Sequence, residues 1–112
     1  MRFETHKYAD VSTGHITQKD ADLLKYYSIP FTERPDTREI FAGPIVYGYP
    51  EGFFVCSGVP NDEVADYIKE CKDVGMSKQF CQILKEAAKQ SMSFVRFDCD
   101  GAHVKGLKEF NW

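Results

Sequence analysis

Two segments of the chain alternate between apolar and polar residues, as half-buried β-strands do. The segment 91–99 alternates clearly, with Val95, Phe97 and Cys99 on one face and polar or aromatic side chains on the other. The segment 3–11 alternates less regularly. We therefore predict a first strand over residues 3–11 and a last strand over residues 91–99.

The middle of the chain, residues 40–60, is apolar and aromatic, and Glu51 is its only charged residue. Pro50-Glu51-Gly52 interrupts this segment with residues that are typical of a turn. The simplest interpretation is a β-hairpin at the centre of the sheet, with residues 45–49 paired to residues 53–57. Alternatively, part of the segment faces a partner, and the candidate interface residues are then Tyr47, Tyr49 and Phe53.

Three further segments have the spacing of amphipathic helices. Thr17 and Asp20 resemble a capping box at the start of a helix over residues 18–27. Asn61 is expected to cap a second helix that ends at Gly75, and Ser77 is expected to cap a third. Their apolar stripes are Val64, Tyr67, Ile68 and Cys71 in the second helix, and Phe80, Ile83, Leu84, Ala87 and Ala88 in the third.

The resulting order of elements is β-α-β-β-α-α-β, which predicts an α+β fold. We expect one domain over residues 1–112, with a four-stranded, mainly antiparallel sheet packed against two or three helices. A charged loop is expected over residues 28–39, whose length is that of a functional or a mobile connection. The expected core consists of Ile45, Val55, Val64, Ile68, Phe80, Ile83, Leu84, Val95 and Phe97, with Trp112 docked on the sheet or its edge.

Composition and charge exclude several classes of protein. The chain of 112 residues has a formal net charge of −3, with the two signs mixed along it. We therefore do not expect nucleic acid as a partner, because nucleic-acid binding usually needs a basic face. The chain also lacks the roughly 20 consecutive apolar residues of a membrane span. Because no signal peptide opens it, we expect a cytoplasmic protein whose four cysteines are buried free thiols.

Candidate chemistry is confined to the turns that follow the first and last predicted strands. Should these strands be parallel neighbours, both turns would lie at the same end of the sheet, where α/β proteins often bind ligands. The histidines and carboxylates could then bind a divalent metal or act as an acid–base set. The candidate ligand or partner site comprises Ser12, Thr13, His15, Asp98, Asp100 and His103.

A structural interpretation of the same residues stays open. Asp98-Cys99-Asp100-Gly101 is typical of a turn that ends a strand, because Asp bonds its own backbone and Gly supplies a positive φ. Ser12-Thr13-Gly14-His15 is an ordinary turn from strand to helix. No nucleophile elbow, paired-cysteine metal motif or phosphate-binding glycine loop is present, so no catalytic residue, cofactor or structural metal is expected.

Several stretches resemble a small bacterial family of unknown function that is carried by plasmids, prophages and other mobile elements. The resemblance covers about half of the chain and implies no activity. It implies a setting, because such cytosolic accessory proteins are encoded beside toxin–antitoxin, anti-restriction and defence genes. The stretches are Ser12–Thr17 with Asp22–Leu24, Gly52–Val55, Val95–Gly101, Val104, Gly106–Leu107 and the closing Phe110–Trp112.

Two functions of different classes follow. The preferred hypothesis is a non-enzymatic accessory protein that binds and modulates a protein partner, for example by inhibiting a host defence or toxin system. The alternative is a metal-binding or hydrolytic enzyme that uses His15, Asp98, Asp100 and His103. A third hypothesis is a homodimer formed through an edge of the sheet.

Overall fold

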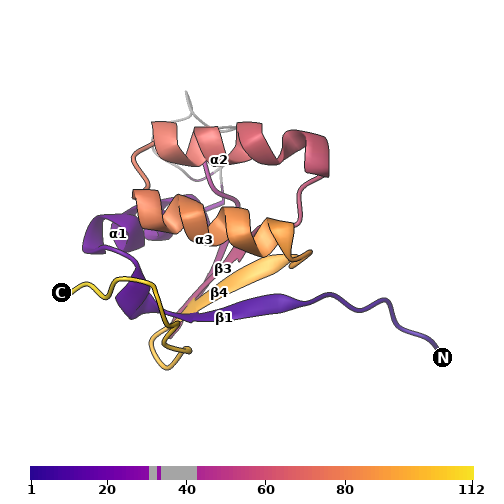
Figure 1. Ribbon diagram of the computed structural model, residues 1–112, viewed down its shortest axis with the longest axis horizontal. Coiled ribbons are helices and arrows are strands. Elements are labelled where there is room, and N and C mark those ends of the chain that lie inside the picture. Colours follow the sequence, from indigo (N-terminus) through magenta and orange to yellow (C-terminus); the bar gives the residue numbers. More distant parts are fainter. Residues whose placement is uncertain (31–32, 34–42) are drawn as a thin grey trace.

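A computed structural model describes residues 1–30, 33 and 43–112 and contains a four-stranded sheet (Figure 1). The strands lie in the order β1-β4-β3-β2. β1 and β4 are parallel, whereas β4 pairs with β3 and β3 with β2 in antiparallel fashion. The strands span Tyr8–Ser12 (β1), Val46–Tyr49 (β2), Gly52–Cys56 (β3) and Phe94–Asp98 (β4).

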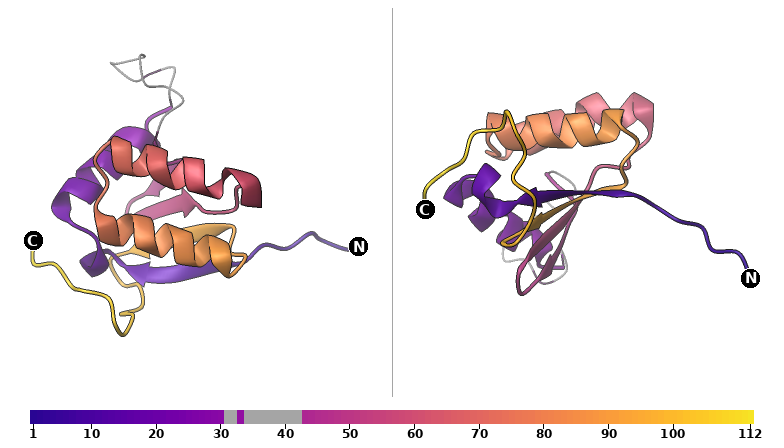
Figure 2. Two further views of the ribbon diagram at one scale, coloured as in Figure 1. Left: turned by 45° about the horizontal axis from the view of Figure 1, so that its top comes forward. Right: turned by 60° about the horizontal axis from the view of Figure 1, so that its bottom comes forward.

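Three helices cover one face of this sheet. They span Gln18–Ser28 (α1), Val64–Asp73 (α2) and Lys78–Lys89 (α3), and 3-10 turns form at Thr13–His15 and Asn61–Glu63. Figure 2 shows α2 and α3 side by side above the strands, with α1 lower, at one end of the sheet. The predicted α+β fold, with its mainly antiparallel sheet and its order of elements, is confirmed.

The helix caps follow the sequence in two of three cases. The hydroxyl of Thr17 accepts from the backbone N–H of Asp20, whose carboxylate accepts from Thr17 N–H in return. Ser77 likewise caps α3 by accepting from Phe80 N–H at 3.2 Å. The cap predicted at Asn61 is wrong, because that residue begins a 3-10 turn and α2 starts at Val64 without a side-chain cap.

The core lies between the sheet and the helices. The rings of Phe80 in α3 and Phe97 in β4 stack with their centroids 5.6 Å apart. Ile68 packs against the core while remaining half-buried, and Val64 is also half-buried. The fully buried side chains include Leu24, Val55, Phe80, Leu84, Val95 and Phe97.

Two residues of the expected core lie at the surface instead. Ile45 is 48% exposed, because it shares the parity of Tyr47 on the side of the sheet that faces away from the helices. Trp112 is 56% exposed, although its Nε1–H docks on the carbonyl of Ile16 at 2.9 Å. The tail is therefore attached through the polar edge of the indole, and the rest of the ring stays in contact with solvent.

The predicted strand boundaries also need correction. The hairpin forms almost as expected. Of its two strands, β3 is interior, whereas β2 lies at an edge of the described sheet. The first strand begins at Tyr8, and the residues before it run away from the body of the protein (Figure 1). The charged loop predicted over residues 28–39 lies mostly outside the described residues.

All four cysteines are free, as predicted. Cys71 and Cys81 are buried, and burial raises the pKa of the Cys71 thiol to about 12. Burial was wrongly predicted for Cys99, which is exposed because it follows β4 in a turn, and Cys56 is half-buried. Among the described residues, no helix combines the length and the apolar character that a bilayer crossing requires.

Candidate functional site

The two turns singled out by sequence lie at the same end of the sheet. β1 and β4 are parallel neighbours, and Ser12 at the end of β1 pairs with Asp98 at the end of β4. This arrangement is the condition on which the predicted His–Asp site depended. Whether the side chains form one site is decided by their hydrogen bonds.

His15 is buried, with 1% of its surface exposed. Its Nε2 accepts a hydrogen bond from the backbone N–H of Val104 at 2.8 Å, so that nitrogen carries no proton. Its Nδ1 therefore carries the proton and donates to the carbonyl of Lys108 at 3.0 Å. Both ring nitrogens are occupied by the backbone of the C-terminal tail, which leaves no lone pair free for a metal ion.

His103 lies next to His15 but in a different environment. The two rings meet edge to face, with their centroids 5.9 Å apart. His103 is exposed, and its Nδ1 contacts the carboxylate of Glu109 in the same tail. His15, His103 and Glu109 form one group of potential metal ligands, in which only the last two have side chains at the surface.

Asp98 belongs to a separate group with Cys99 and Asp100. Its Oδ1 accepts from the backbone N–H of Asp100 at 2.8 Å, and its Oδ2 accepts from the hydroxyl of Tyr49 at 2.5 Å. These bonds favour the ionised carboxylate, with Tyr49 as the larger cause, and lower the pKa of Asp98. Desolvation and the same carboxylate raise the pKa of Tyr49.

Among the described residues, the potential ligands therefore fall into two groups, and neither group joins His15 or His103 to Asp98 or Asp100. Ser12 shapes the intervening turn, because its hydroxyl accepts from Gly14 N–H at 3.0 Å. Its own N–H donates to the carbonyl of Ala102 in the tail. Thr13 contributes its carbonyl, which accepts from Ile16 N–H at 3.2 Å.

The turn after β1 serves mainly to hold the C-terminal tail. Besides the two bonds of His15, Gly14 O accepts from the backbone N–H of Phe110 at 2.8 Å. Gln79 of α3 donates to the carbonyls of His15 and Lys108 and accepts from Lys108 N–H. Side chains that resemble a catalytic set in the sequence thus make bonds that fix the path of the chain.

A different surface has the composition of a binding site. Since Val95 and Phe97 face the helices, their neighbours Phe94 and Arg96 face the other side of the sheet. The register of the strands places aromatic side chains of β1, β2 and β3 beside them. We call this surface the open face, and it consists of Tyr8, Tyr47, Tyr49, Phe54, Phe94 and Arg96.

The aromatic rings of the open face contact one another. Phe54 lies at their centre, with its centroid 5.7 Å from Tyr8, 5.6 Å from Tyr49 and 6.2 Å from Phe94. Tyr47 meets Phe94 edge to face at 6.4 Å. Such contacts stabilise aromatic pairs and hold the rings in fixed positions. The open face is therefore a preorganised surface rather than a set of independent side chains.

Arg96 provides the cation of the open face. Its guanidinium lies 5.2 Å from the centroid of the Tyr8 ring, which is a cation–π distance. Its Nε and Nη2 both donate to Oδ1 of Asp10, at 3.1 and 2.8 Å. The hydrogen bond to Asp10 is the main cause that raises the pKa of Arg96.

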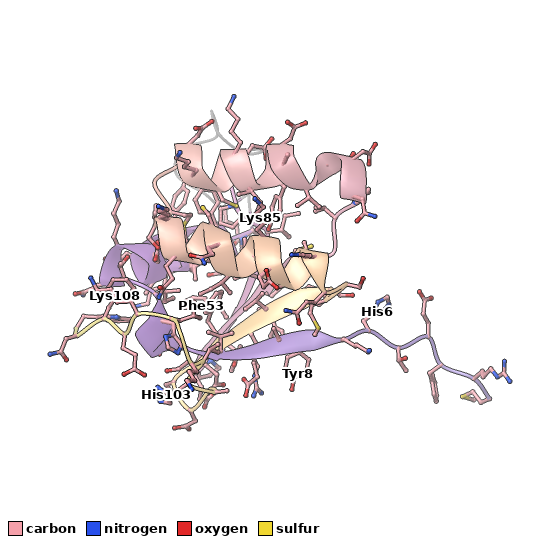
Figure 3. The ribbon with its side chains drawn as sticks, in the orientation of Figure 1. His6, Tyr8, Phe53, Lys85, His103 and Lys108 are labelled. Carbon is pink, nitrogen blue, oxygen red and sulfur yellow. The ribbon has the colours of Figure 1, made fainter. Side chains whose placement is uncertain are left out.

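Two side chains of the open face are exposed, and the other four, Tyr49, Phe54, Phe94 and Arg96, are half-buried. Tyr47 is 61% exposed and Tyr8 is 48% exposed, and Tyr8 points away from the helices (Figure 3). Of the predicted interface residues, Tyr47 and Tyr49 lie on the open face, where Tyr49 is half-buried. Phe53 does not, because it points to the helix side and is 9% exposed.

The prediction missed Tyr8, Phe54, Phe94 and Arg96. The signal was present in β4, where the alternation places Phe94 and Arg96 on the parity opposite to the core. By itself this alternation predicts only a half-buried strand, because the sequence does not show that β4 lies between β1 and the hairpin that carry the aromatic neighbours.

One family model matches residues 8–112 and carries the description "Family of unknown function (DUF5983) C-terminal domain". No curated protein and no solved structure matches the chain. The family match agrees with the resemblance to a family of unknown function, whereas an origin in mobile elements stays a prediction. Since the match covers nearly the whole chain, this protein belongs to the family of unknown function DUF5983, as an example of its C-terminal domain.

Proposed function

We propose that this protein is a non-enzymatic accessory protein that binds a protein partner through the open face. The single observation that carries the proposal is a cluster of five aromatic rings around one arginine, with Tyr8 and Tyr47 exposed, on a side of the sheet that no described helix covers. Tyrosine and arginine are enriched among the residues that dominate protein interfaces. Rings held in place lose little conformational freedom on binding, which favours affinity.

Charge favours a protein over a nucleic acid as the partner. The only cation of the open face is Arg96, which is paired with Asp10, and Asp98 lies at the same side of the sheet. A surface that stacks bases of single-stranded nucleic acid combines its aromatic rings with a positively charged groove. The open face has the rings without the excess of positive charge.

The resemblance to proteins of mobile elements supports a setting for this binding. We infer that the partner belongs to a host defence or toxin system and that the accessory protein modulates it by occupying its surface. A protein that acts by occupancy needs a rigid binding surface and no catalytic group. This agrees with the structural use of His15 and Asp98 in the turns.

The test compares the proteins that the wild type captures with those that two open-face variants capture. The wild-type chain and the variants Tyr47→Ala and Tyr8→Ala serve as baits in native host lysate, and mass spectrometry identifies what is retained. We expect one protein to be retained by the wild type and lost with both variants. Lys85→Ala is the control, because Lys85 is an exposed residue of α3 that belongs neither to the open face nor to any other proposed interface.

Two results would contradict the proposal. One is a partner that is retained equally by the wild type and by both tyrosine variants. The other is capture that disappears after nuclease treatment, which would indicate nucleic acid as the ligand. Circular dichroism of each variant excludes loss of the fold as the cause of lost binding.

The alternative of a metal-binding or hydrolytic enzyme remains a separate proposal with less support. His15 would have to release the N–H of Val104 before it could bind a metal ion or accept a proton, because Nε2 is its only unprotonated ring nitrogen. Thermal unfolding with and without Zn²⁺ or Mg²⁺ tests it. A rise in melting temperature that is lost in both His103→Ala and Asp98→Asn would favour this alternative.

A further inference from the structure

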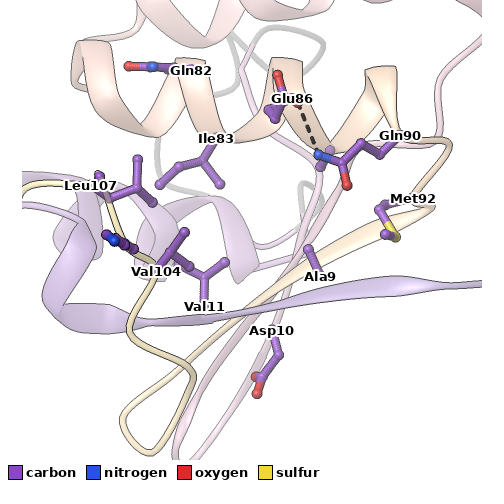
Figure 4. Close-up of a pocket in the computed structure, with 13 residues that line it drawn as sticks. Ala9, Asp10, Val11, Gln82, Ile83, Glu86, Gln90, Met92, Val104 and Leu107 are labelled. Carbon is purple, nitrogen blue, oxygen red and sulfur yellow. Dashed lines mark hydrogen bonds between the residues drawn. The ribbon is translucent and has the colours of Figure 1, made fainter.

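A groove of about 400 Å³ runs between β1, α3 and the C-terminal tail (Figure 4). It is distinct from the open face, because it lies on the helix side of the sheet. Charged side chains stand at its rim, where Glu86 accepts a hydrogen bond from Gln90. Its lining is mostly apolar and includes Ala9, Val11, Ile83, Ala87, Met92 and Leu107.

The groove lies along an unpaired strand edge. Among the described strands, β1 pairs only with β4. The carbonyl of Lys7 accepts from Ser93 N–H, so odd-numbered residues direct their backbone groups to β4 and even-numbered residues direct theirs outward. Tyr8 and Asp10 therefore offer backbone donors and acceptors to another strand. Ser12 does not, because its N–H already donates to Ala102 in the tail.

The residues before β1 have an alternation of side chains that would let them bind in such a groove. This N-terminal arm, residues 1–7, extends away from the body of the protein (Figure 1). Phe3 is 75% exposed, although it is a large apolar residue. If the alternation of β1 continues through the arm, Phe3 and Lys7 lie on the same side as Ala9 and Val11, which line the groove.

We propose that the groove binds the N-terminal arm of a second copy of this chain, in a twofold dimer in which the two β1 strands pair in antiparallel fashion. The outward-facing positions that remain available are His6, Tyr8 and Asp10, and their midpoint is Tyr8. A twofold axis at Tyr8 places this residue opposite its own copy and His6 opposite Asp10. Each arm then occupies the groove of the other copy, so that every contact occurs twice.

Complementarity along the groove favours a second copy as the occupant. In this register, Lys7 of the second copy lies opposite Ala9, at the end of the groove where Glu86 provides a carboxylate. Phe3 of the second copy reaches the other end, where Val104 and Leu107 provide apolar contacts beside the cation of Lys105. The carboxylate of Glu86 at one end attracts Lys7, and Lys105 at the other end repels it, so the charges favour this direction of the arm.

Molar mass measured by light scattering during size exclusion, at two concentrations, tests the dimer. We expect the wild-type mass to approach twice that of the monomer as concentration rises. Phe3→Ala and Lys7→Glu should each return the protein to the monomer, and Lys7→Glu combined with Glu86→Lys should restore the dimer. Tyr47→Ala is the control and should remain dimeric, because Tyr47 belongs to the open face and lies far from β1 in the strand order.

A disulfide experiment tests the register. Tyr8→Cys is combined with Cys99→Ser, since Cys99 is the exposed native thiol. Opposed residues of an antiparallel pair have Cα atoms about 5.5 Å apart, which a disulfide can bridge. Mild oxidation should therefore link two chains through residue 8, whereas the Cys99→Ser protein alone should stay unlinked.

The proposal is overturned if the wild-type protein stays monomeric up to about 1 mM, the range of very weak association. It is equally overturned by a dimer that persists in Phe3→Ala and Lys7→Glu but is lost in Tyr47→Ala, because that dimer would use the open face. The dimer and the proposed function can fail separately. If the protein is strictly monomeric and the Tyr47→Ala variant still fails to capture the partner, the dimer is excluded and the proposed function is supported.

Discussion

The imidazole Nε2 of His15 accepts the backbone N–H of Val104 at a distance of 2.8 Å, across 89 positions of the sequence. A buried ring whose two nitrogens both bond backbone groups joins the turn after β1 to the C-terminal tail. The tail also lines the groove beside β1 through Val104 and Leu107. His15 thus determines the shape of a surface on which it is not itself exposed.

Replacement of His15 by alanine should destabilise the protein by about 2–4 kcal/mol, because it creates a cavity and leaves the N–H of Val104 without its acceptor. The amide hydrogens of the tail should also exchange faster in the variant than in the wild type, whereas those of the sheet should change less. Urea unfolding and hydrogen exchange by mass spectrometry measure the two effects. His103→Ala is the matched control and should change stability little, because His103 is exposed. Equal stability of both variants would contradict the role given to His15.

Tyr49→Phe should raise the pKa of Asp98 toward its ordinary value, because it removes the hydroxyl that is the main cause of the lowered pKa. A carboxylate whose pKa is lowered by folding stabilises the protein above its ordinary pKa of about 4, and this contribution is lost as the pH falls through the folded-state value. The Tyr49 variant should therefore lose stability at pH 7 and differ less from the wild type at pH 2–3. NMR titration of the Asp98 carboxyl carbon checks the pKa directly.

Tyr47→Phe is the control for this titration, because it removes a hydroxyl from the same strand and the same face while leaving the bond from Tyr49 to Asp98 in place. An unchanged pKa of Asp98 in Tyr49→Phe would mean that the Asp100 N–H alone determines it.

Asp20→Asn should destabilise the protein by about 2–3 kcal/mol, because Asp20 is fully buried and accepts from three donors. Its Oδ1 accepts from Ser77 N–H at 2.7 Å, and its Oδ2 accepts from the Ser77 hydroxyl at 2.5 Å and from Thr17 N–H. An amide nitrogen at either position faces a donor instead of accepting from it. Asp22→Asn, an exposed position on the same helix, should leave the urea midpoint nearly unchanged.

Most elements could be predicted because their signals are local. The caps at Thr17 and Ser77 and the break at Gly75 depend on residues only a few positions away. The stripe of α3 buries Phe80, Ile83 and Leu84 as its spacing predicts. These signals needed no knowledge of the strand order.

The site could be predicted only in part, because its residues meet through the strand order and the path of the tail. Phe54 and Phe94 become neighbours only when β3 pairs with β4, and no local pattern states that pairing. Asp98 ends β4 and His15 follows β1 at the same end of the sheet, because the two strands are parallel neighbours. Their hydrogen bonds to Tyr49 and to Val104 direct them into separate groups. The roles of Asp98 and His15 therefore depend on hydrogen bonds to residues distant in the sequence, which residue type alone does not indicate.

Gly101 gives a last prediction about the path of the tail. A Cβ atom at this position would lie 2.5 Å from the carbonyl oxygen of Val11 and 2.9 Å from the nitrogen of Ser12, both of which are backbone atoms of β1. Backbone atoms of a paired strand cannot move aside as a side chain can, so the tail must shift instead. Gly101→Ala should therefore destabilise the protein by about 1–3 kcal/mol and lengthen the bond from Ser12 N–H to Ala102.

Amide exchange at Ser12 measures that shift, since its N–H is protected by the carbonyl of the tail. Gly14→Ala is the matched control in the adjoining turn, because its added Cβ would meet only the Ser12 hydroxyl at 3.3 Å. We expect fast exchange at Ser12 in Gly101→Ala and slower exchange in Gly14→Ala. If Ser12 stays protected in Gly101→Ala, β1 and the tail have room to separate without breaking their bond, and the close contact at Gly101 does not fix the tail.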